Sequence, residues 1–247
     1  MSVQLDRLGP AALAEPDQGS AAEPRDPSVL VYRTLHDAIL EQRLAPGTKL
    51  GEEQLAEIFQ VSRPVVRRAL ARLSFERVVE IKPNRGAFIA NPTVEAAQQV
   101  FEARRAVEEA IVRLCTRNHS RKDLARLRRH VEIELEAERK GERVRWIRLT
   151  GEFHIVVARA AGNAILTGFL EDLVAQTSLI IGLYGSGAKS LCCEADHTDI
   201  VEAIASGDER AAVARMLRHL QACEASLDMA TTKEPEDLSA ILIQRRR

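Results

Sequence analysis

The fold of this chain is decided by residues 50–90, which read LGEEQLAEIFQVSRPVVRRALARLSFERVVEIKPNRGAFIA. Apolar side chains recur at helical spacing in two segments of this stretch: Leu55, Ile58 and Phe59 in the first, and Val66, Leu70 and Leu73 in the second. Ser62 lies between the segments, where it is placed to cap the second helix, and Pro64 is tolerated in that helix's first turn. The spacing therefore predicts two short helices joined by a tight turn.

Two short apolar stretches follow the second helix. Residues 78–81 (VVEI) and 87–89 (AFI) lie on either side of Pro83-Asn84-Arg85-Gly86. Alternating apolar residues around such turn-forming residues are typical of a β-hairpin. Together with the helix pair, this hairpin predicts a winged helix-turn-helix.

Four arginines occupy the outward face of the second helix: Arg63, Arg67, Arg68 and Arg72. A short helix whose exposed side is almost wholly arginine, braced by another helix, suits the major groove of DNA. The alternative is that these arginines are solvated or paired with acidic side chains. DNA is therefore the first partner to consider, ahead of a small substrate.

The charge is distributed unevenly along the chain. Residues 31–90 carry ten basic and seven acidic side chains, a net charge of +3, whereas the whole chain of 247 residues carries −1. A modestly basic module joined to an acidic remainder fits a DNA-reading head on a body that does not bind DNA. The length permits one large or two modest domains.

We expect a cytoplasmic protein that does not associate with membranes, because no apolar run approaches a membrane-spanning length and the N-terminus lacks a signal pattern. Its four cysteines are Cys115, Cys192, Cys193 and Cys223. They are too few and too irregularly spaced for a disulfide framework, which predicts reduced thiols. A thiol switch at the adjacent Cys192-Cys193 pair is an alternative.

Composition and periodicity divide the chain into four parts. Residues 1–27 hold four prolines and no sustained period, so we expect a disordered N-terminal arm. Residues 28–91 form the predicted DNA-binding domain, which opens with a helix from Ser28 to about Gln42. Residues 94–230 are expected to be helical throughout, and residues 231–247 to be a flexible C-terminal tail.

The helical part has recognisable boundaries. We predict helices over residues 94–118, from a cap at Ser120, over about 143–161, from a cap at Asn163, and over about 193–205 and 208–229. A Gly/Ser-rich loop is expected from Gly182 to Ser190. Since no strand pattern competes, this part is predicted to be an all-α helical bundle, and the fold class is mainly α.

Two blocks of sequence carry a resemblance to a known family. The first is LAEIFQVSRPVVRRALARL followed by NRGAFI, and the second is FEARRAVEEA, then EFHIVVARAAGN, then DHTDIVEAIASGDERAAVARMLRHL. In this order and spacing they resemble the GntR transcriptional regulators, in the FadR subgroup with a C-terminal FCD effector-binding domain. The resemblance covers about residues 28–229.

The resemblance implies a homodimer, not an enzyme, whose two winged helices read the half-sites of a palindromic operator. It implies a helical domain that binds a small molecule and thereby releases or remodels the DNA complex, and repression is the expected outcome. The DNA contacts that it implies are Ser62, Arg63, Arg67, Arg85 and Gly86, to which the arginine face of the helix adds Arg68 and Arg72. The operator and the effector are not encoded in any motif.

Three positions of the DNA-binding block depart from the family. Glu53 stands where the family commonly has an arginine, Pro64-Val65 where it has Thr-Pro, and Arg68 where it has glutamate. Because one basic contact is lost and another gained, we expect an altered sequence preference more than a loss of binding.

Three histidines, His154, His197 and His219, lie on three different predicted helices. A helical bundle can bring such side chains together, and neutral imidazoles suit Zn²⁺ or Ni²⁺. The resemblance implies that they are metal ligands, joined by an aspartate one turn before His154. That position is Thr150 here, so water or an effector carboxylate would complete the shell; the alternative is a polar pocket without metal. Glu152 would face away and is not a substitute.

The resemblance also implies an effector site with Arg104, Thr150 and Asn163. Arg104 would meet an anionic effector, although a pair with Glu108 one turn later is an alternative. For Asn163 we favour a capping role. If Arg104 and the histidines converge, a small carboxylate could bridge metal and guanidinium.

Two further functions remain open at this stage. The protein could be a metal-sensing regulator in which the ion itself is the signal. It could also be a metal-dependent hydrolase, because three histidines with an open position can activate water. We see no well-placed general base for hydrolysis, and a winged helix would be superfluous in such an enzyme.

Overall fold

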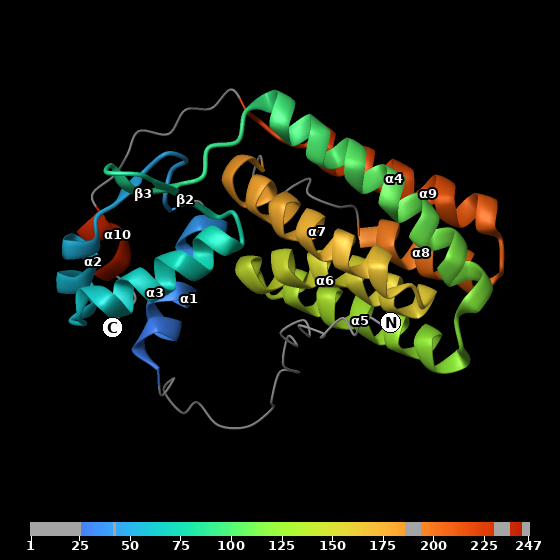
Figure 1. Cartoon of the computed structure of the whole chain (residues 1–247). Helices are drawn as coiled ribbons and strands as arrows, with labels where there is room; N and C mark the ends of the chain where they lie inside the picture. The colour runs from blue at the N-terminus through green and yellow to red at the C-terminus, as the bar shows by residue number, and fades with distance from the viewer. Residues whose placement is uncertain (1–25, 42, 186–193, 230–237, 244–247) are drawn as a thin grey trace, which may run out of the picture.

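The computed structural model describes residues 26–41, 43–185, 194–229 and 238–243, and it shows a mainly helical chain in two parts (Figure 1). A small winged helix-turn-helix head stands beside a longer helical bundle, which confirms the predicted fold class. The predicted N-terminal arm falls almost wholly outside the described residues.

The head combines three helices with a three-stranded sheet. Its elements in chain order are α1 (Pro27–Leu40), β1 (Lys49–Leu50), α2 (Glu52–Phe59), α3 (Arg63–Phe75), β2 (Val79–Lys82) and β3 (Gly86–Ile89). The sheet is antiparallel with the order β1-β3-β2, and Val79 pairs with Ile89 across the hairpin. The two short helices and the hairpin are confirmed. Strand β1 was not predicted, because two residues are too few to show alternation.

A side-chain cap marks the start of α1, whereas α2 and α3 begin without a capping hydrogen bond from a side chain. The Asp26 side chain accepts a hydrogen bond from the Ser28 backbone N–H at 2.9 Å, so α1 begins at Pro27 and not at Ser28. Ser62 occupies the cap position of α3, but its side chain makes no capping hydrogen bond. At the wing tip, Asn84 and Gly86 adopt positive φ angles of 58° and 98°, the left-handed conformation that turn residues supply.

Six helices build the bundle: α4 (Val94–Asn118), α5 (Arg121–Arg139), α6 (Arg143–Ala161), α7 (Ala164–Tyr184), α8 (Glu194–Ala205) and α9 (Glu209–Ala225). Ser120 and Asp123 form a reciprocal capping box at α5, and Asn163 caps α7, as predicted. Gly182 continues α7 instead of opening a loop, and most of the predicted loop, residues 186–190, lies outside the described part of the chain. The last helix ends at Ala225, before the predicted 229.

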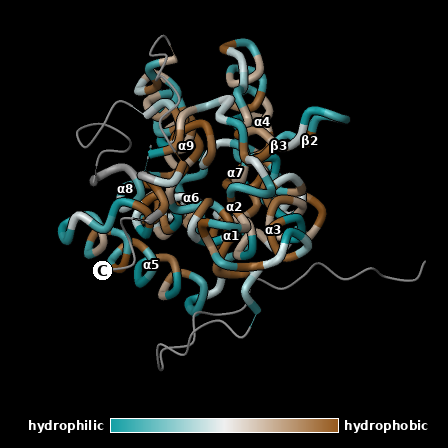
Figure 2. The backbone as a smooth tube through the Cα atoms, turned by 90° about the vertical axis from the view of Figure 1, so that its left-hand side faces the viewer, coloured by the Kyte–Doolittle hydropathy of each residue, from teal (hydrophilic) through white to brown (hydrophobic). Residues whose placement is uncertain are grey.

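Helix α5 buries one side in the bundle, and this buried side includes a residue of the candidate site. Leu127, Val131, Glu134 and Ala137 are the buried residues of α5, spaced three or four apart. Figure 2 shows hydrophilic and hydrophobic residues following one another along this helix, as expected for one buried and one exposed side. Glu134 is therefore a charged side chain on an otherwise apolar face.

Head and bundle are packed against each other through α1 and α7. A Cβ added to Gly182 would lie 2.8 Å from Leu40 Cδ2, so glycine at this position permits the close approach of the two helices. At the junction, the Tyr184 hydroxyl donates to Asn91 Oδ1 at 2.8 Å. These contacts tie the linker between the two parts to the bundle.

The C-terminal segment returns to the head as a short helix, α10 (Leu238–Ile243). Leu238, Ile241 and Leu242 are buried in the core of the head, and Arg43 Nη1 donates to the Ile241 carbonyl oxygen at 2.7 Å. Over these six residues the structure differs from the predicted flexible tail, and the rest of residues 231–247 lies outside the described part of the chain. The reason is that three apolar side chains at helical spacing find an apolar surface on α1 and α2.

Helix α7 is long and apolar enough to cross a membrane by length and composition, in contrast to the prediction that no apolar run approaches that length. Glu171 and Asp172 interrupt its apolar run, and for that reason no continuous stretch is visible in the sequence. In the structure α7 packs against α1, α4 and α6. Residues of α7 such as Leu170, Leu179 and Ile180 are buried in the interior, whereas Ile165 and Phe169 are 70% and 59% exposed.

Candidate functional site

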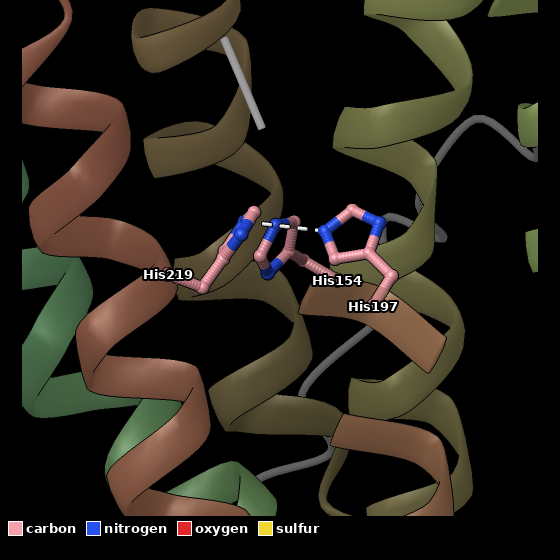
Figure 3. A group of neighbouring side chains, drawn as sticks. All are labelled: His154, His197 and His219. Atoms are coloured by element: carbon pink, nitrogen blue, oxygen red, sulfur yellow. Dashed lines mark hydrogen bonds between the residues drawn. The ribbon is translucent and has the colours of Figure 1, made fainter. Parts of the chain in front are cut away.

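Three histidines from three helices meet inside the bundle (Figure 3): His154 on α6, His197 on α8 and His219 on α9. All three are buried, and one nitrogen of each lies within 4.8 Å of the others. His197 Nε2 and His219 Nε2 are 3.1 Å apart. Tetrahedral zinc with Zn–N bonds of 2.0–2.1 Å separates its nitrogen ligands by about 3.3 Å, so this spacing fits a metal.

Two buried carboxylates stand behind these rings. Glu108 Oε2 on α4 accepts from His154 Nδ1 at 2.5 Å, and Glu134 Oε2 on α5 accepts from His197 Nδ1 at 2.8 Å. A carboxylate on Nδ1 sets the tautomer and leaves Nε2 to bind a metal, the arrangement that metal-ligating histidines commonly show. This role of the two glutamates is not among the predictions from the sequence. The available signal was a glutamate on the buried face of an amphipathic helix.

The electrostatics favour neutral imidazoles beside ionised carboxylates. Burial lowers the pKa of His154 well below its usual value, and the nearby Arg104 adds to this effect; burial also lowers the pKa of His197. Burial alone would raise the pKa of Glu108, but His154 and Arg104 outweigh it and bring the pKa to about 2. Neutral imidazole is the form that binds metal ions.

Thr150, at the position of the family's aspartate, is linked to the cluster through Glu134. Its hydroxyl donates to Glu134 Oε1 at 2.7 Å, while the other oxygen of Glu134 accepts from His197. Thr150 thus supports the carboxylate behind His197 and is engaged there. Glu152 is exposed, as the helical spacing predicted.

A cavity that is partly open to solvent lies against the cluster. Its lining includes Arg104, Trp146, Ile147, Thr150, His154, Ile181, His219 and Cys223. The lining of the cavity therefore combines a cationic side chain, two imidazoles and apolar side chains. This is the composition of a site for a small anionic ligand.

Arg104 holds the cationic end of the cavity. Its Nε donates to Glu108 Oε1 at 2.5 Å and its Nη1 to Thr177 Oγ1 at 3.0 Å, so the intrahelical pair with Glu108 is present. Arg104 Nη2 is buried and has no hydrogen-bond partner among the residues that the structure describes. Asn163 is not part of the cavity lining; its side chain accepts from the backbone N–H groups of Ile165 and Leu166.

The arginine face of α3 is exposed but engaged with acidic side chains. Arg67 forms two hydrogen bonds with Glu52, of 3.1 and 2.8 Å, and Arg63 Nη2 lies 3.7 Å from the same carboxylate. Arg68 lies 3.5 Å from Asp26. Such exposed pairs are weak, so they do not prevent these arginines from turning to phosphates.

Arg72 differs from the other arginines of α3 because it lies against α1. Its guanidinium carbon is 3.9 Å from the centre of the Tyr32 ring, and its Nε is 3.3 Å from Glu76 Oε1. Ser62, Arg85 and Gly86 are exposed, the last two at the tip of the wing.

Two protein-family models match this chain. The model described as bacterial regulatory proteins, gntR family, matches residues 27–89, and the FCD domain model matches residues 99–222.

Curated relatives match most of the chain. The HTH-type transcriptional regulator LutR of Bacillus subtilis is 30% identical over 203 residues, 72% of this chain and 90% of the relative. The HTH-type transcriptional repressor RspR of Escherichia coli is 25% identical over 194 residues, 77% of this chain and 84% of the relative.

Solved structures share the fold. A GntR transcriptional regulator from Rhodococcus sp. RHA1 superposes with a TM-score of 0.66 at 24% identity, covering 80% of this chain and 95% of that chain. McbR/YncC of E. coli superposes with a TM-score of 0.63 at 21% identity, covering 79% and 93%.

Proposed function

The chain belongs to the GntR family of bacterial regulatory proteins and carries an FCD domain, and from this premise we propose that it is a homodimeric repressor controlled by a small carboxylate. It is a DNA-binding transcriptional regulator, and its curated relatives carry the names of regulators. In this proposal two heads bind a palindromic operator in the cytoplasm, and the ligand in the bundle changes how the heads are held.

The observation that carries the proposal is the shared cavity of Arg104 and the histidine cluster. Arg104 offers Nη2 as a buried donor, and His154 and His219 line the same space. When bound, a zinc or nickel ion would supply a Lewis-acidic partner for an anion. A small carboxylate could then meet the guanidinium and the metal together.

The path from this cavity to the head supports control of DNA binding. The cavity is lined by residues of α7, among them Ser178 and Ile181. Gly182 of the same helix packs on Leu40 of α1, which in turn packs on the arginine-bearing α3. A ligand that shifts α7 would therefore bias the position of the head.

The DNA-binding side of the proposal rests on the exposed face of α3 and on the wing tip. Arg63, Arg67 and Arg68 would contact bases or phosphates from the major groove, and Arg85 with Gly86 would enter the adjacent minor groove. Arg72, held against Tyr32, would reach a phosphate only from the rim of this face. The altered residues Pro64 and Arg68 would set the sequence preference.

For the homodimer we infer an interface on α7. Ile165 and Phe169 lie one turn apart on this helix, and both side chains are largely exposed. Exposed apolar side chains on one helix face mark a surface for association. A second copy related by a twofold axis would bury both.

A metal-sensing regulator is the second candidate, and the two carboxylates behind the histidines favour it. Glu108 and Glu134 orient the rings without an effector, so an ion alone could complete the site. Hydrolysis finds less support, because these two carboxylates are hydrogen-bonded to histidines and are not placed as general bases.

The test is binding to the DNA upstream of the protein's own gene, measured by fluorescence anisotropy at several salt concentrations. A panel of small organic acids is added with and without bound zinc. We expect salt-dependent binding that one acid weakens in the zinc-loaded protein. Release on adding or removing zinc alone would support the metal sensor instead, and absence of any salt-dependent DNA binding would overturn both.

A further inference from the structure

We propose that Cys223 is a fourth ligand of the metal held by His154, His197 and His219. This inference rests on the proposed metal site and deepens it, by assigning a centre of three imidazoles and one thiolate. Cys223 lies on α9 four residues after His219, so both side chains project from the same face of the helix one turn apart.

The position of the sulfur fits a ligand of the same ion. Cys223 Sγ lies 3.7 Å from His219 Nε2. In tetrahedral zinc, with Zn–S of 2.3 Å and Zn–N of 2.0–2.1 Å, sulfur and nitrogen ligands are separated by about 3.5 Å. Cys223 is 2% exposed and lines the same cavity as His154 and His219.

The sulfur also supplies a charge that the site otherwise lacks. Thr150 brings no carboxylate, and its hydroxyl is bonded to Glu134. The buried groups around a dication are then two carboxylates, from Glu108 and Glu134, and one guanidinium, from Arg104, which leaves a net charge of +1. One thiolate brings that total to zero, and buried charge is tolerated when it is compensated.

The binding step is a simple exchange of a proton for a metal. The S–H bond of Cys223 breaks, its proton passes to the solvent, and a bond forms between the sulfur and the ion with no change of oxidation state. A soft thiolate ligand favours Zn²⁺ over harder ions such as Mn²⁺ or Mg²⁺. The consequence is a site selective for zinc.

The test replaces zinc by Co²⁺ in the full-length protein, because a thiolate bound to cobalt adds an intense near-ultraviolet charge-transfer band. We expect this band in the wild type and its loss in Cys223→Ser, with the visible cobalt bands of the histidine ligands retained. The matched control is Cys115→Ser, which alters a buried cysteine on α4 in the apolar core of the bundle. This control should keep the band.

Each outcome decides the inference. A charge-transfer band that persists in Cys223→Ser, or visible cobalt bands without it in the wild type, would refute the thiolate ligand and leave the histidine site standing. No cobalt or zinc binding at all would refute both, while the DNA-binding activity would be judged separately by anisotropy.

A second measurement needs no variant. X-ray absorption of the zinc-loaded wild type should show one sulfur neighbour at about 2.3 Å. Nitrogen and oxygen neighbours alone would overturn the inference. Where Cys223→Ser folds, its zinc affinity should also fall by about 10- to 100-fold in competition with a chromophoric chelator, a loss of the size seen when support of a metal site is removed.

Discussion

Thr150 and Glu134 are joined by a hydrogen bond of 2.7 Å that links α6 to α5 behind the histidine cluster. Through this bond an uncharged residue supports the histidine cluster, because the other oxygen of Glu134 accepts from His197. A position that the family fills with an acidic ligand is therefore used here to hold a carboxylate contributed by another helix.

We expect Thr150→Val to weaken zinc binding by about tenfold, because Glu134 loses the donor that fixes its orientation and His197 loses a firmly held partner. Zinc affinity by chelator competition measures the effect. Thr167→Val is the matched control, since its hydroxyl donates to the Asn163 carbonyl at the start of α7, away from the cavity. Equal affinities for wild type and Thr150→Val would show that the hydrogen bond does not support the site.

Glu52→Gln should raise affinity for nonspecific double-stranded DNA by about two- to fivefold at low salt. Glu52 pairs with Arg67 and Arg63, and an exposed pair that DNA must replace is worth up to about 1 kcal/mol. Fluorescence anisotropy at two salt concentrations measures the change. Glu53→Gln, which removes the same charge from the neighbouring position of α2, serves as the control; a gain of equal size there would attribute the effect to net charge and not to the released arginines.

Leu242→Ala should lower the free energy of unfolding by about 2–5 kcal/mol, because it leaves a cavity where α10 is buried in the head. Urea denaturation followed by circular dichroism measures the loss. Leu30→Ala removes the same atoms from a side chain on α1 that is 44% exposed, and should cost much less. If both variants lose the same stability, α10 does not contribute to the core in solution.

Phe169→Glu should weaken self-association by roughly thirtyfold, the equivalent of about 2 kcal/mol for a central interface residue. Sedimentation equilibrium measures the dimer constant. Phe75→Glu introduces the same change at another exposed phenylalanine, on α3 of the head, and is expected to leave the constant unaltered. A dimer that survives Phe169→Glu would place the interface elsewhere.

The free energy of unfolding should decrease as the pH falls below about 6.5, because His36 is partly buried in the folded protein. Burial lowers the pKa of His36 from its ordinary value, so the unfolded chain takes up the proton first and acidification favours unfolding. Melting temperatures at pH 7.5 and 5.5 measure this, and His36→Gln should show a smaller drop than the wild type. Parallel drops would mean that His36 is equally easy to protonate in both states.

The helices of the bundle were largely predictable because their signals are local. The bounds of α4 and α6 agree with the predicted residues 94–118 and 143–161, since caps and apolar spacing lie within the helices themselves. Helix α10 was missed for the opposite reason. Six residues do not sustain a helix alone, and contacts with the head, apolar burial and the hydrogen bond from Arg43, stabilise Leu238–Ile243.

The candidate site was predictable in part. His154, His197 and His219 could be named from the sequence, and in the fold one nitrogen of each lies within 4.8 Å of the others. Glu134 and Cys223 could not be assigned in the same way. The sequence does not reveal which side chains of other helices a buried glutamate will meet, and the fold places Glu134 at His197. The four-residue spacing of His219 and Cys223 on α9 is local, but only the packing of the helices brings both to the cavity.

The sequence by itself determined the family, the order of the helices and the arginine face of α3, because all three depend on residues close together in the chain. Only the tertiary structure decided what surrounds the three histidines: Glu108 from α4, Glu134 from α5 and Cys223 from α9. The contacts of the two glutamates join residues 46 and 63 positions apart, and their geometry follows from how the helices pack, which no local pattern specifies.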